Sequence, residues 1–407
     1  MVLLLGLQVK ANPIVIITIK KTSFSSLFIY FVFLNYVVFT QTNNFFLNNN
    51  LCNKKILIAP LDWGLGHATR CIVIIQYLQI LGCNITIAAS GKTKNLLHNE
   101  LKNVAFLDLP GYDIAYSKNK RTLALKILIQ IPKIFKIIRF ENKWVEAAIK
   151  KYHFDVVISD NRYGLYTKKA VSVFITHQLK VQASLPVIEN LLQRINYRFI
   201  NRFSECWVPD FKEKLNIAGK LSHPSKLPAI PIKYLGPISR LQRPGISDVN
   251  FKWIAIISGP EPQRTILENK IFEFAKNTEE KIIIVRGLPG ASEQETASPN
   301  CTVFNHLNTL EIQAAIQASE FIISRCGYTT VMEILSLQKK SVLIPTPGQT
   351  EQEYLALHLS QQHWCYSFKQ DEDFAMHLQQ VSSFQYKLPE IDTELYKAVL
   401  KDFVTSL

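Results

Sequence analysis

Short apolar runs rich in β-branched residues recur along the chain from Lys54 onward, and each is followed by a turn and a stretch with helical spacing. Runs of this kind predict buried parallel strands. Strands that alternate with helices are typical of a doubly wound α/β sheet with right-handed crossovers. The first series comprises KKILIAP, NITIAAS, VAFLDL, DVVISD, SVFITH and ECWVPD, of which ECWVPD is predicted to be the last strand.

A second series of the same kind follows a segment between Pro209 and Pro244 whose prolines and glycines are typical of a linker. It comprises WIAIISG, KIIIVRG, TVFNHL, EFIISRCG and KSVLIPTP. A chain of 407 residues has room for two such domains. We therefore expect two Rossmann-like domains, over 53–236 and 249–407, joined by a linker at 237–248. They are expected to face each other across a cleft, with a ligand at the carboxyl ends of the strands.

Residues 1–52 differ from the rest and are predicted to stand outside this fold. The first fifty contain no acidic residue, and the uncharged run Leu27–Thr40 is shorter than the ~20 residues that a spanning helix needs. We interpret the extension as a mis-set translation start. A signal anchor, with Lys20 and Lys21 on the inner side, is the alternative.

Charge and cysteine usage narrow the function further. A net charge of +14 favours partners that carry phosphate, such as a nucleotide, a nucleic acid or an anionic lipid. The chain has no nucleic-acid recognition motif, so we expect no nucleic-acid partner. Seven scattered cysteines without a C-x-x-C pair suit a reducing compartment. Asp371 and Asp373 are expected to open a helix rather than bind metal, and neither a metal nor a cofactor is predicted.

The strongest motif is the run from Ser324 to Glu333, where a buried strand enters a turn of small residues and then a helix. The free N–H groups at a helix N-terminus suit a diphosphate. Gly327 allows the backbone to approach the phosphates, and Glu333 can accept hydrogen bonds from ribose hydroxyls. An ordinary strand, turn and helix has the same pattern.

This motif resembles the nucleotide-sugar site of GT-B glycosyltransferases with a family 28-like C-terminal domain. The resemblance is greatest to the lipid-linked N-acetylglucosaminyltransferases of peptidoglycan synthesis, and it runs from Lys54 to about Gln370. It implies that the C-terminal half binds a UDP-sugar. Glu353 departs from the glutamine pair of that family, which leaves the sugar open. The implied donor residues are Ser258, Gly259, Arg264, Arg286, His306, Leu307, Ser324, Gly327, Tyr328, Thr329, Thr330, Glu333, Gln349, Gln352 and Glu353.

In the first half, the turn Gly64-Leu65-Gly66-His67 lacks the third glycine of a dinucleotide fingerprint, because Thr69 occupies its place. It resembles instead the glycine-rich loop of the glycosyltransferase N-terminal domain. His67 is then the leading candidate for a general base, with Asp160 as the second candidate. The alternative is that His67 has no role in catalysis and only caps the helix that it begins. The acceptor-side residues are expected to be Gly64, Gly66, Arg162, His177 and Gln178.

The expected reaction transfers a hexose from a UDP-sugar to the hydroxyl group of an acceptor. N-acetylglucosamine is the first candidate for the hexose. The resemblance implies a lipid-linked acceptor and inversion at the anomeric carbon. A UDP-sugar epimerase and a non-catalytic nucleotide-sugar-binding subunit are the alternatives. The basic, amphipathic stretch Asn119–Trp144 fits either an anionic membrane surface or a pair of core-packing helices. The resemblance favours a cytoplasmic protein that contacts the inner face of the membrane.

Overall fold

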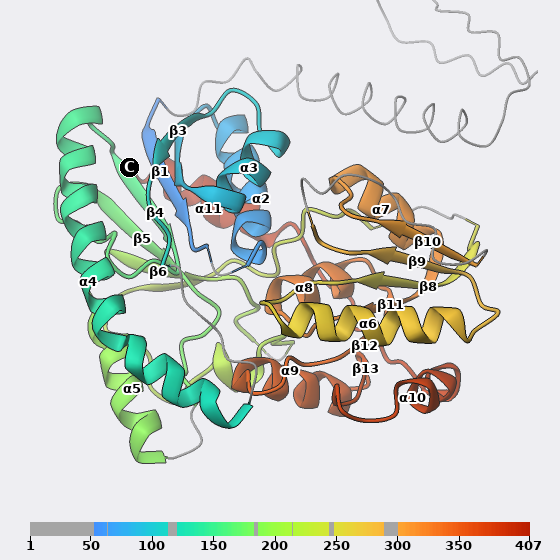
Figure 1. Cartoon of the computed structure of the whole chain (residues 1–407). Coiled ribbons are helices and arrows are strands. Elements are labelled where there is room, and N and C mark those ends of the chain that lie inside the picture. The colour runs from blue at the N-terminus through green and yellow to red at the C-terminus, as the bar shows by residue number, and fades with distance from the viewer. Residues whose placement is uncertain are drawn as a thin grey trace, which may run out of the picture. The chain divides into compact units, whose positions relative to one another are not determined.

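The computed structural model describes residues 53–62, 64–112, 120–182, 186–213, 215–243, 248–288 and 300–407, and these form two parallel α/β sheets (Figure 1). Every strand pair in both sheets is parallel. The predicted fold class is therefore confirmed. The predictions for residues 1–52 lie outside the described residues.

The first sheet has seven strands in the order β3-β2-β1-β4-β5-β6-β7. The order reverses beside β1, which is the arrangement of a doubly wound sheet. The strands are β1 (Lys55–Pro60), β2 (Asn84–Ala89), β3 (Ala105–Asp108), β4 (Val156–Asp160), β5 (Val171–Ile175), β6 (Glu205–Val208) and β7 (Ile232–Tyr234). ECWVPD is thus not the last strand, because β7 pairs beyond it. At three residues, β7 is too short to give a periodic signal.

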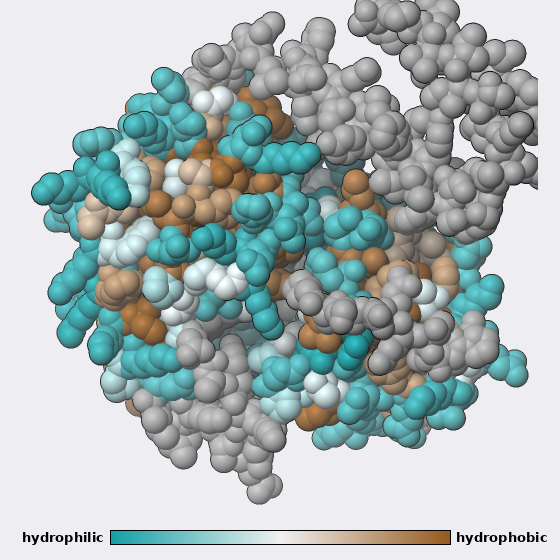
Figure 2. Space-filling view, turned by 45° about the horizontal axis from the view of Figure 1, so that its top comes forward, coloured by the Kyte–Doolittle hydropathy of each residue, from teal (hydrophilic) through white to brown (hydrophobic). Residues whose placement is uncertain are grey.

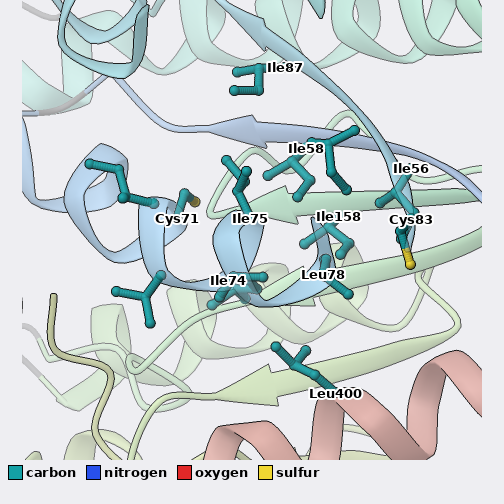
Figure 3. Close-up of a cluster of buried hydrophobic side chains, with 14 of the residues drawn as sticks. Ile56, Ile58, Cys71, Ile74, Ile75, Leu78, Cys83, Ile87, Ile158 and Leu400 are labelled. Carbon is teal, nitrogen blue, oxygen red and sulfur yellow. The ribbon is translucent and has the colours of Figure 1, made fainter. Parts of the chain in front are cut away.

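Alternate residues of β1 pack on opposite faces of this sheet, as the period of a strand requires. Ile56 and Ile58 belong to one buried cluster, whereas Leu57 and Ala59 belong to another. Figure 3 shows the first cluster, in which side chains of the central strands meet those of α2. The helices of this half are α2 (Gly66–Ile80), α3 (Gly91–Glu100), α4 (Lys120–Tyr152) and α5 (Pro186–Ile200), with the short 3₁₀ turn η1 (Gly219–Leu221).

The second sheet has six strands in the order β10-β9-β8-β11-β12-β13, with helices on both faces. Residues of α7, α8 and α9 share one buried cluster, and residues of α6 and α10 share the other. The strands are β8 (Phe251–Ile256), β9 (Ile282–Val285), β10 (Cys301–Phe304), β11 (Ser319–Ser324), β12 (Lys340–Leu343) and β13 (Tyr366–Ser367). The helices are α6 (Gln263–Lys276), α7 (Thr309–Gln317), α8 (Tyr328–Ser336), α9 (Thr350–Gln361) and α10 (Phe374–Gln380), followed by the 3₁₀ turn η2 (Val381–Ser383).

The last helix, α11 (Leu395–Thr405), does not belong to the second half. Leu400, labelled in Figure 3, and Phe403 are buried in the cluster of the first sheet. Phe403 meets Trp207 there with ring centroids 5.0 Å apart. The expected C-terminal domain over 249–407 is therefore wrong at its end. The apolar spacing of this helix predicts a buried face, but it does not identify the sheet that buries it.

The basic, amphipathic stretch is one helix, α4, rather than a pair, and Pro132 lies inside it. Val145 and Ile149 pack on the first sheet with Leu57, so this later part of the helix contributes to the core. Of the helices that the structure describes, none combines the length and the apolar character needed to cross a membrane.

Candidate functional site

Side chains and loops at the carboxyl ends of the two sheets are in direct contact. The Thr329 hydroxyl at the start of α8 donates to the Gly66 carbonyl oxygen at 3.2 Å. A Cβ atom at Gly66 would lie only 3.1 Å from that hydroxyl, so a larger residue would push the two loops apart. The Tyr328 hydroxyl also crosses, to the carbonyl oxygen of Pro209 at 2.7 Å. The carboxyl ends of the two sheets, where the sequence predicted a ligand, are thus in contact.

The N-terminus of α8 has the geometry of an anion site. Gly327 is the N-cap residue, with φ −77° and ψ 138°, and no side chain caps this helix end. A Cβ atom at Gly327 would have only the Thr330 hydroxyl oxygen near it, at 3.9 Å. The first N–H groups of the helix are therefore open to a ligand, and their partial positive charge favours a phosphate.

Two residues of the predicted donor motif turn inward instead. Ser324 is 1% exposed and donates to the carbonyl oxygen of Ile256 at 2.9 Å. Tyr328 is 3% exposed, and its ring stacks on that of His177 at 4.2 Å. The expectation that Ser324 and Tyr328 contact the donor is therefore wrong, because both side chains support the turn from beneath.

Arg325 is a buried cation that the sequence reasoning missed. It is 1% exposed, and it donates to the carbonyl oxygens of Gln263, Ile344 and Pro345 and to the side chain of Gln370. Its Nε atom has no hydrogen-bond partner, and burial lowers its pKa to about 10. No carboxylate pairs with it among the described residues, so its charge adds to the positive potential beside the α8 turn. Its position directly before Cys326-Gly327 was the available signal.

The loop after β8 lies above this arginine. Ser258 and Gly259 are exposed, and Gly259 has φ +110°, a conformation that only glycine adopts readily. A Cβ atom at Gly259 would lie 3.9 Å from the Arg325 side chain. The loop is thus placed where the sequence expected a phosphate cradle.

Arg264 and Arg286, both predicted to reach the donor, are held by the same carboxylate. Arg264 Nη1 lies 3.0 Å from Oε1 of Glu268, and Arg286 Nε lies 2.7 Å from the same oxygen. Burial raises the pKa of Glu268, but the bonds from the two guanidinium groups outweigh it and leave the pKa below its usual value. Arg264 also pairs with Glu261. The structure therefore contradicts the prediction for Arg264, whose guanidinium is committed to carboxylates. Arg286 is shared with Asn305 Oδ1 at 3.1 Å.

Glu333 lies in α8 and accepts a bond from Arg240 Nε at 2.8 Å through its Oε1 atom. Arg240 continues to the Thr309 hydroxyl at 3.2 Å, and that hydroxyl donates to Glu100 of the first half at 2.9 Å. These contacts could not be predicted from the sequence, because the residues that make them are far apart in it. Glu333 is thus oriented by a cation from the linker.

Other donor candidates lie in the loop after β10 and at the start of α9. The Gln352 amide accepts from Thr346 N–H at 2.9 Å and donates to Gln349 Oε1 at 2.6 Å, and Glu353 accepts from Gly348 N–H at 3.0 Å. These side chains fix the loop between β12 and α9. His306 is exposed and Leu307 is half-buried, in the loop between β10 and α7.

On the acceptor side, α2 presents His67 to the end of β4. His67 Nδ1 lies 3.0 Å from Asp160 Oδ1, and the His67 side chain is 15% exposed whereas Asp160 is fully buried. Burial lowers the pKa of His67, Asp160 raises it and Arg70 lowers it, with a net decrease. A histidine with a lowered pKa is neutral at neutral pH and can accept a proton.

Asp160 itself is not suited to be the base. Burial raises the pKa of a carboxyl, but the Arg70 guanidinium and the His67 ring hold that of Asp160 well below its usual range. Arg70 Nε donates to Asp160 Oδ2 at 2.6 Å, and both side chains are almost fully buried. The geometry assigns Asp160 to orienting His67. Arg70 was missed, although its place three residues after His67 puts the two on one face of a helix.

The other acceptor-side candidates differ in position. Arg162 is 1% exposed and donates to Glu141 Oε1 at 2.7 Å, so the expectation that it faces an acceptor is wrong. His177 contacts the second half, where its Nε2 lies 2.7 Å from Glu351 Oε1. Gln178 is half-buried, Gly64 has φ +81°, and Gly66 is the first residue of α2.

Comparison with known proteins finds a glycosyltransferase domain in each half of the chain. The glycosyltransferase family 28 C-terminal domain matches residues 263–383, and a glycosyl transferase family 1 domain matches residues 54–181. An uncharacterized glycosyltransferase of Methanosarcina acetivorans is 23% identical over 336 residues, which are 74% of this chain and 81% of that protein. The chain is a glycosyltransferase.

Solved structures support the fold of the enzyme. Arabidopsis thaliana UGT89C1 complexed with UDP-L-rhamnose superposes with a TM-score of 0.58 at 12% identity, over 88% of this chain and 95% of that one. The glycotransferase of kitacinnamycin gives a TM-score of 0.57 at 13% identity, over 87% and 95%. The two-domain GT-B architecture expected from the sequence is confirmed.

Proposed function

We propose that the glycosyltransferase transfers a hexose from a UDP-sugar to a hydroxyl acceptor, with the donor on α8 and the acceptor beside His67. The observation that carries this proposal is the contact between Thr329 and Gly66. It brings the uncapped N-terminus of α8 next to the loop that holds the only histidine–aspartate pair at either of these sheet ends within the described residues.

The proposed mechanism needs one proton transfer and one stabilised leaving group. His67 Nδ1–H donates to Asp160, so Nε2 is free to take the proton of the acceptor hydroxyl. The helix N-terminus at Gly327 and the buried charge of Arg325 stabilise the departing diphosphate without reorganisation. With these roles we propose a direct displacement at the anomeric carbon, and the inversion is what the resemblance to the glycosyltransferase family implies. No metal or cofactor enters the proposed steps.

The acceptor is proposed to be lipid-linked, and the supporting surface lies on α4 and α5. Val187 is 81% exposed and Leu191, one helical turn later on α5, is 57% exposed. The exposed Lys133 and Lys136 belong to α4, which packs against α5. Exposed apolar side chains on α5, together with cations on the neighbouring α4, suit an anionic membrane surface. The face drawn in Figure 2 is mostly hydrophilic with hydrophobic groups scattered over it. We propose a location at the cytoplasmic face of the membrane.

The sugar is proposed to be N-acetylglucosamine, and one assay tests the whole proposal. Purified full-length protein is incubated with UDP-N-acetylglucosamine labelled in the sugar, with and without extracted membrane lipids. We expect lipid-dependent release of UDP and label in the lipid phase. An isomerised sugar nucleotide would show an epimerase, and binding of UDP without turnover would show a non-catalytic subunit; either result would refute the proposal.

A further inference from the structure

Arg70 stands between two histidines at the junction of the halves. Its Nη2 atom lies 2.9 Å from His67 Nδ1, and its Nη1 atom lies 3.5 Å from His177 Nδ1. Its Nε atom donates to Asp160 at 2.6 Å. A single guanidinium group therefore contacts the candidate base, the carboxylate that orients it, and a histidine that reaches the donor half.

The chemistry of the neighbours determines the state of His177. An arginine can only donate hydrogen bonds, whereas a carboxylate can only accept them. His177 has Arg70 at Nδ1 and Glu351 Oε1 at Nε2, 2.7 Å away. The ring satisfies both when Nδ1 is bare and Nε2 carries the proton, which is a neutral imidazole. Protonation at Nδ1 would place a hydrogen against the guanidinium.

His67 has a choice that His177 lacks. Its Nδ1 atom lies within hydrogen-bond distance of both Asp160 Oδ1 and Arg70 Nη2. If Nδ1 donates to Asp160, Nε2 is bare and can act as a base. If Nδ1 accepts from Arg70, Nε2 carries the proton and the neutral ring has no free site for another. Arg70 Nη2 also donates to Asp160 Oδ1, and the hydrogens of a guanidinium are fixed in its plane, so the position of the whole guanidinium group decides which tautomer His67 adopts.

We propose that Arg70 is a positioning residue that ties the activity of His67 to the docking of the donor half. When Glu351 of α9 bonds His177, Arg70 is held between His177 and Asp160, and His67 donates to Asp160. Without Glu351, His177 is released and Arg70 is free to donate to His67. This inference rests on the proposed function only in treating His67 as the base.

Several groups surround His67 and are part of the expected pH response. Asp160 approaches from β4, Arg70 and Cys71 from α2, His177 from the end of β5, and Glu351 from α9. Arg70 lowers the pKa of His67 by Coulomb repulsion, and Asp160 raises it. Replacing Arg70 by an uncharged residue must therefore raise the pKa of His67.

The test is a histidine NMR titration of the full chain, which does not depend on any sugar or acceptor. The variants are Arg70→Met and Arg70→Lys, and the matched control is Arg162→Met, which removes an equally buried arginine from the Glu141 pair. We expect an upward shift of the His67 titration in Arg70→Met and none in the control. An unshifted His67 in Arg70→Met, or the same shift in the control, would overturn the proposal.

If Arg70→Met fails to fold, Arg70→Lys tests the proposal, because lysine keeps the positive charge but cannot contact two partners as the forked guanidinium group does. We expect the His67 titration to stay low while kcat for UDP release falls ~10–100-fold with little change in KM, as misplacement of a catalytic group does. Wild-type kcat in Arg70→Lys would refute positioning. Failure of the proposed function is separate, since wild-type protein would then release no UDP although His67 still titrates.

The cross-domain link is tested by Glu351→Gln against Glu353→Gln. Both remove one carboxylate from α9, but only Glu351 contacts His177, whereas Glu353 bonds Gly348. We expect the resonances of His177 and His67 to move in Glu351→Gln and to stay in Glu353→Gln. Equal movement in both variants, or in neither, would show that the donor half does not act on His67.

Discussion

Replacement of Gly327 by alanine should separate donor binding from folding. The residue has φ −77° and ψ 138°, which any amino acid adopts, and a Cβ atom there would approach nothing closer than the Thr330 hydroxyl oxygen at 3.9 Å. The added methyl group therefore meets no protein atom at close range. The free energy of unfolding should change by no more than ~0.5 kcal/mol, as for substitutions away from special features.

The same methyl group lies at the open end of α8, where we propose that the diphosphate binds. A phosphate that accepts from the first N–H groups of the helix must approach within about 3 Å of the backbone. Displacing it loses at least one hydrogen bond to a charged group, worth ~1.5–3 kcal/mol. The Kd for UDP should therefore rise roughly 10- to 150-fold.

Calorimetric titration with UDP and thermal unfolding of the same samples measure the two effects. Asp373→Ala is the control with the opposite expectation, because it should affect stability and not UDP binding. Asp373 caps α10 by accepting from Met376 N–H at 2.9 Å. The substitution should cost about 1 kcal/mol of stability and leave UDP affinity unchanged. Unchanged UDP affinity in Gly327→Ala would refute the placement of the donor on α8. A large loss of stability in Gly327→Ala would show that the backbone at Gly327 does not tolerate a Cβ atom.

Four further outcomes are expected. Glu333→Ala should weaken UDP binding by ~1–3 kcal/mol in calorimetry with the fold intact, because a charged acceptor is lost. His67→Ala should reduce turnover roughly 10²–10⁴-fold at unchanged UDP affinity, and near-wild-type turnover would remove it from the mechanism. Because the pKa of Asp160 is lowered by folding, its contribution to stability is present above its unfolded pKa, about 3.9, and is lost as the pH falls below it; acid unfolding curves of wild type and Asp160→Asn should converge at low pH. A chain that begins at Asn53 should fold and bind UDP like the full chain, and any membrane association should weaken with added salt.

The fold and the location of the site could be predicted because both depend on local patterns. Apolar β-branched runs predicted eleven strands, and all eleven coincide with the strands β1–β6 and β8–β12. The polar residues that follow those strands, including His67, Asp160 and His177, meet at one junction. A parallel sheet places all its carboxyl ends on one edge, so the order of elements alone is enough to bring them together.

The inward or outward direction of individual side chains could not be predicted. Arg264 and Arg162 follow strands just as ligand-binding arginines do, yet each is buried against a glutamate. A buried arginine needs such a partner, and Glu141 is 21 residues away from Arg162 along the chain. Glu268 is four residues after Arg264 on the same helix, so its spacing was a signal that the sequence analysis did not use. Arg325 is the converse case, because it is buried and no carboxylate pairs with it among the described residues.

The chain crosses between the two halves at two places. One crossing is the linker after β7, and the other is the segment that leads into α11, which packs on the first sheet. The two crossings touch, because a Cβ atom at Gly236 would lie 3.0 Å from the Cβ of Leu395. Gly236 has φ +71°, so the chain turns there in a conformation suited to glycine.

The contacts across the junction near His67 include polar pairs. Thr329 with Gly66 and His177 with Glu351 are polar pairs, which water can replace when they separate. Apolar packing crosses the junction as well, because the Tyr328 ring stacks on His177 and Leu221 belongs to a buried cluster of the second sheet. The Glu351 contact with His177 is therefore one of several that hold the halves together, and under the proposal for Arg70 it is the one on which the state of His67 depends.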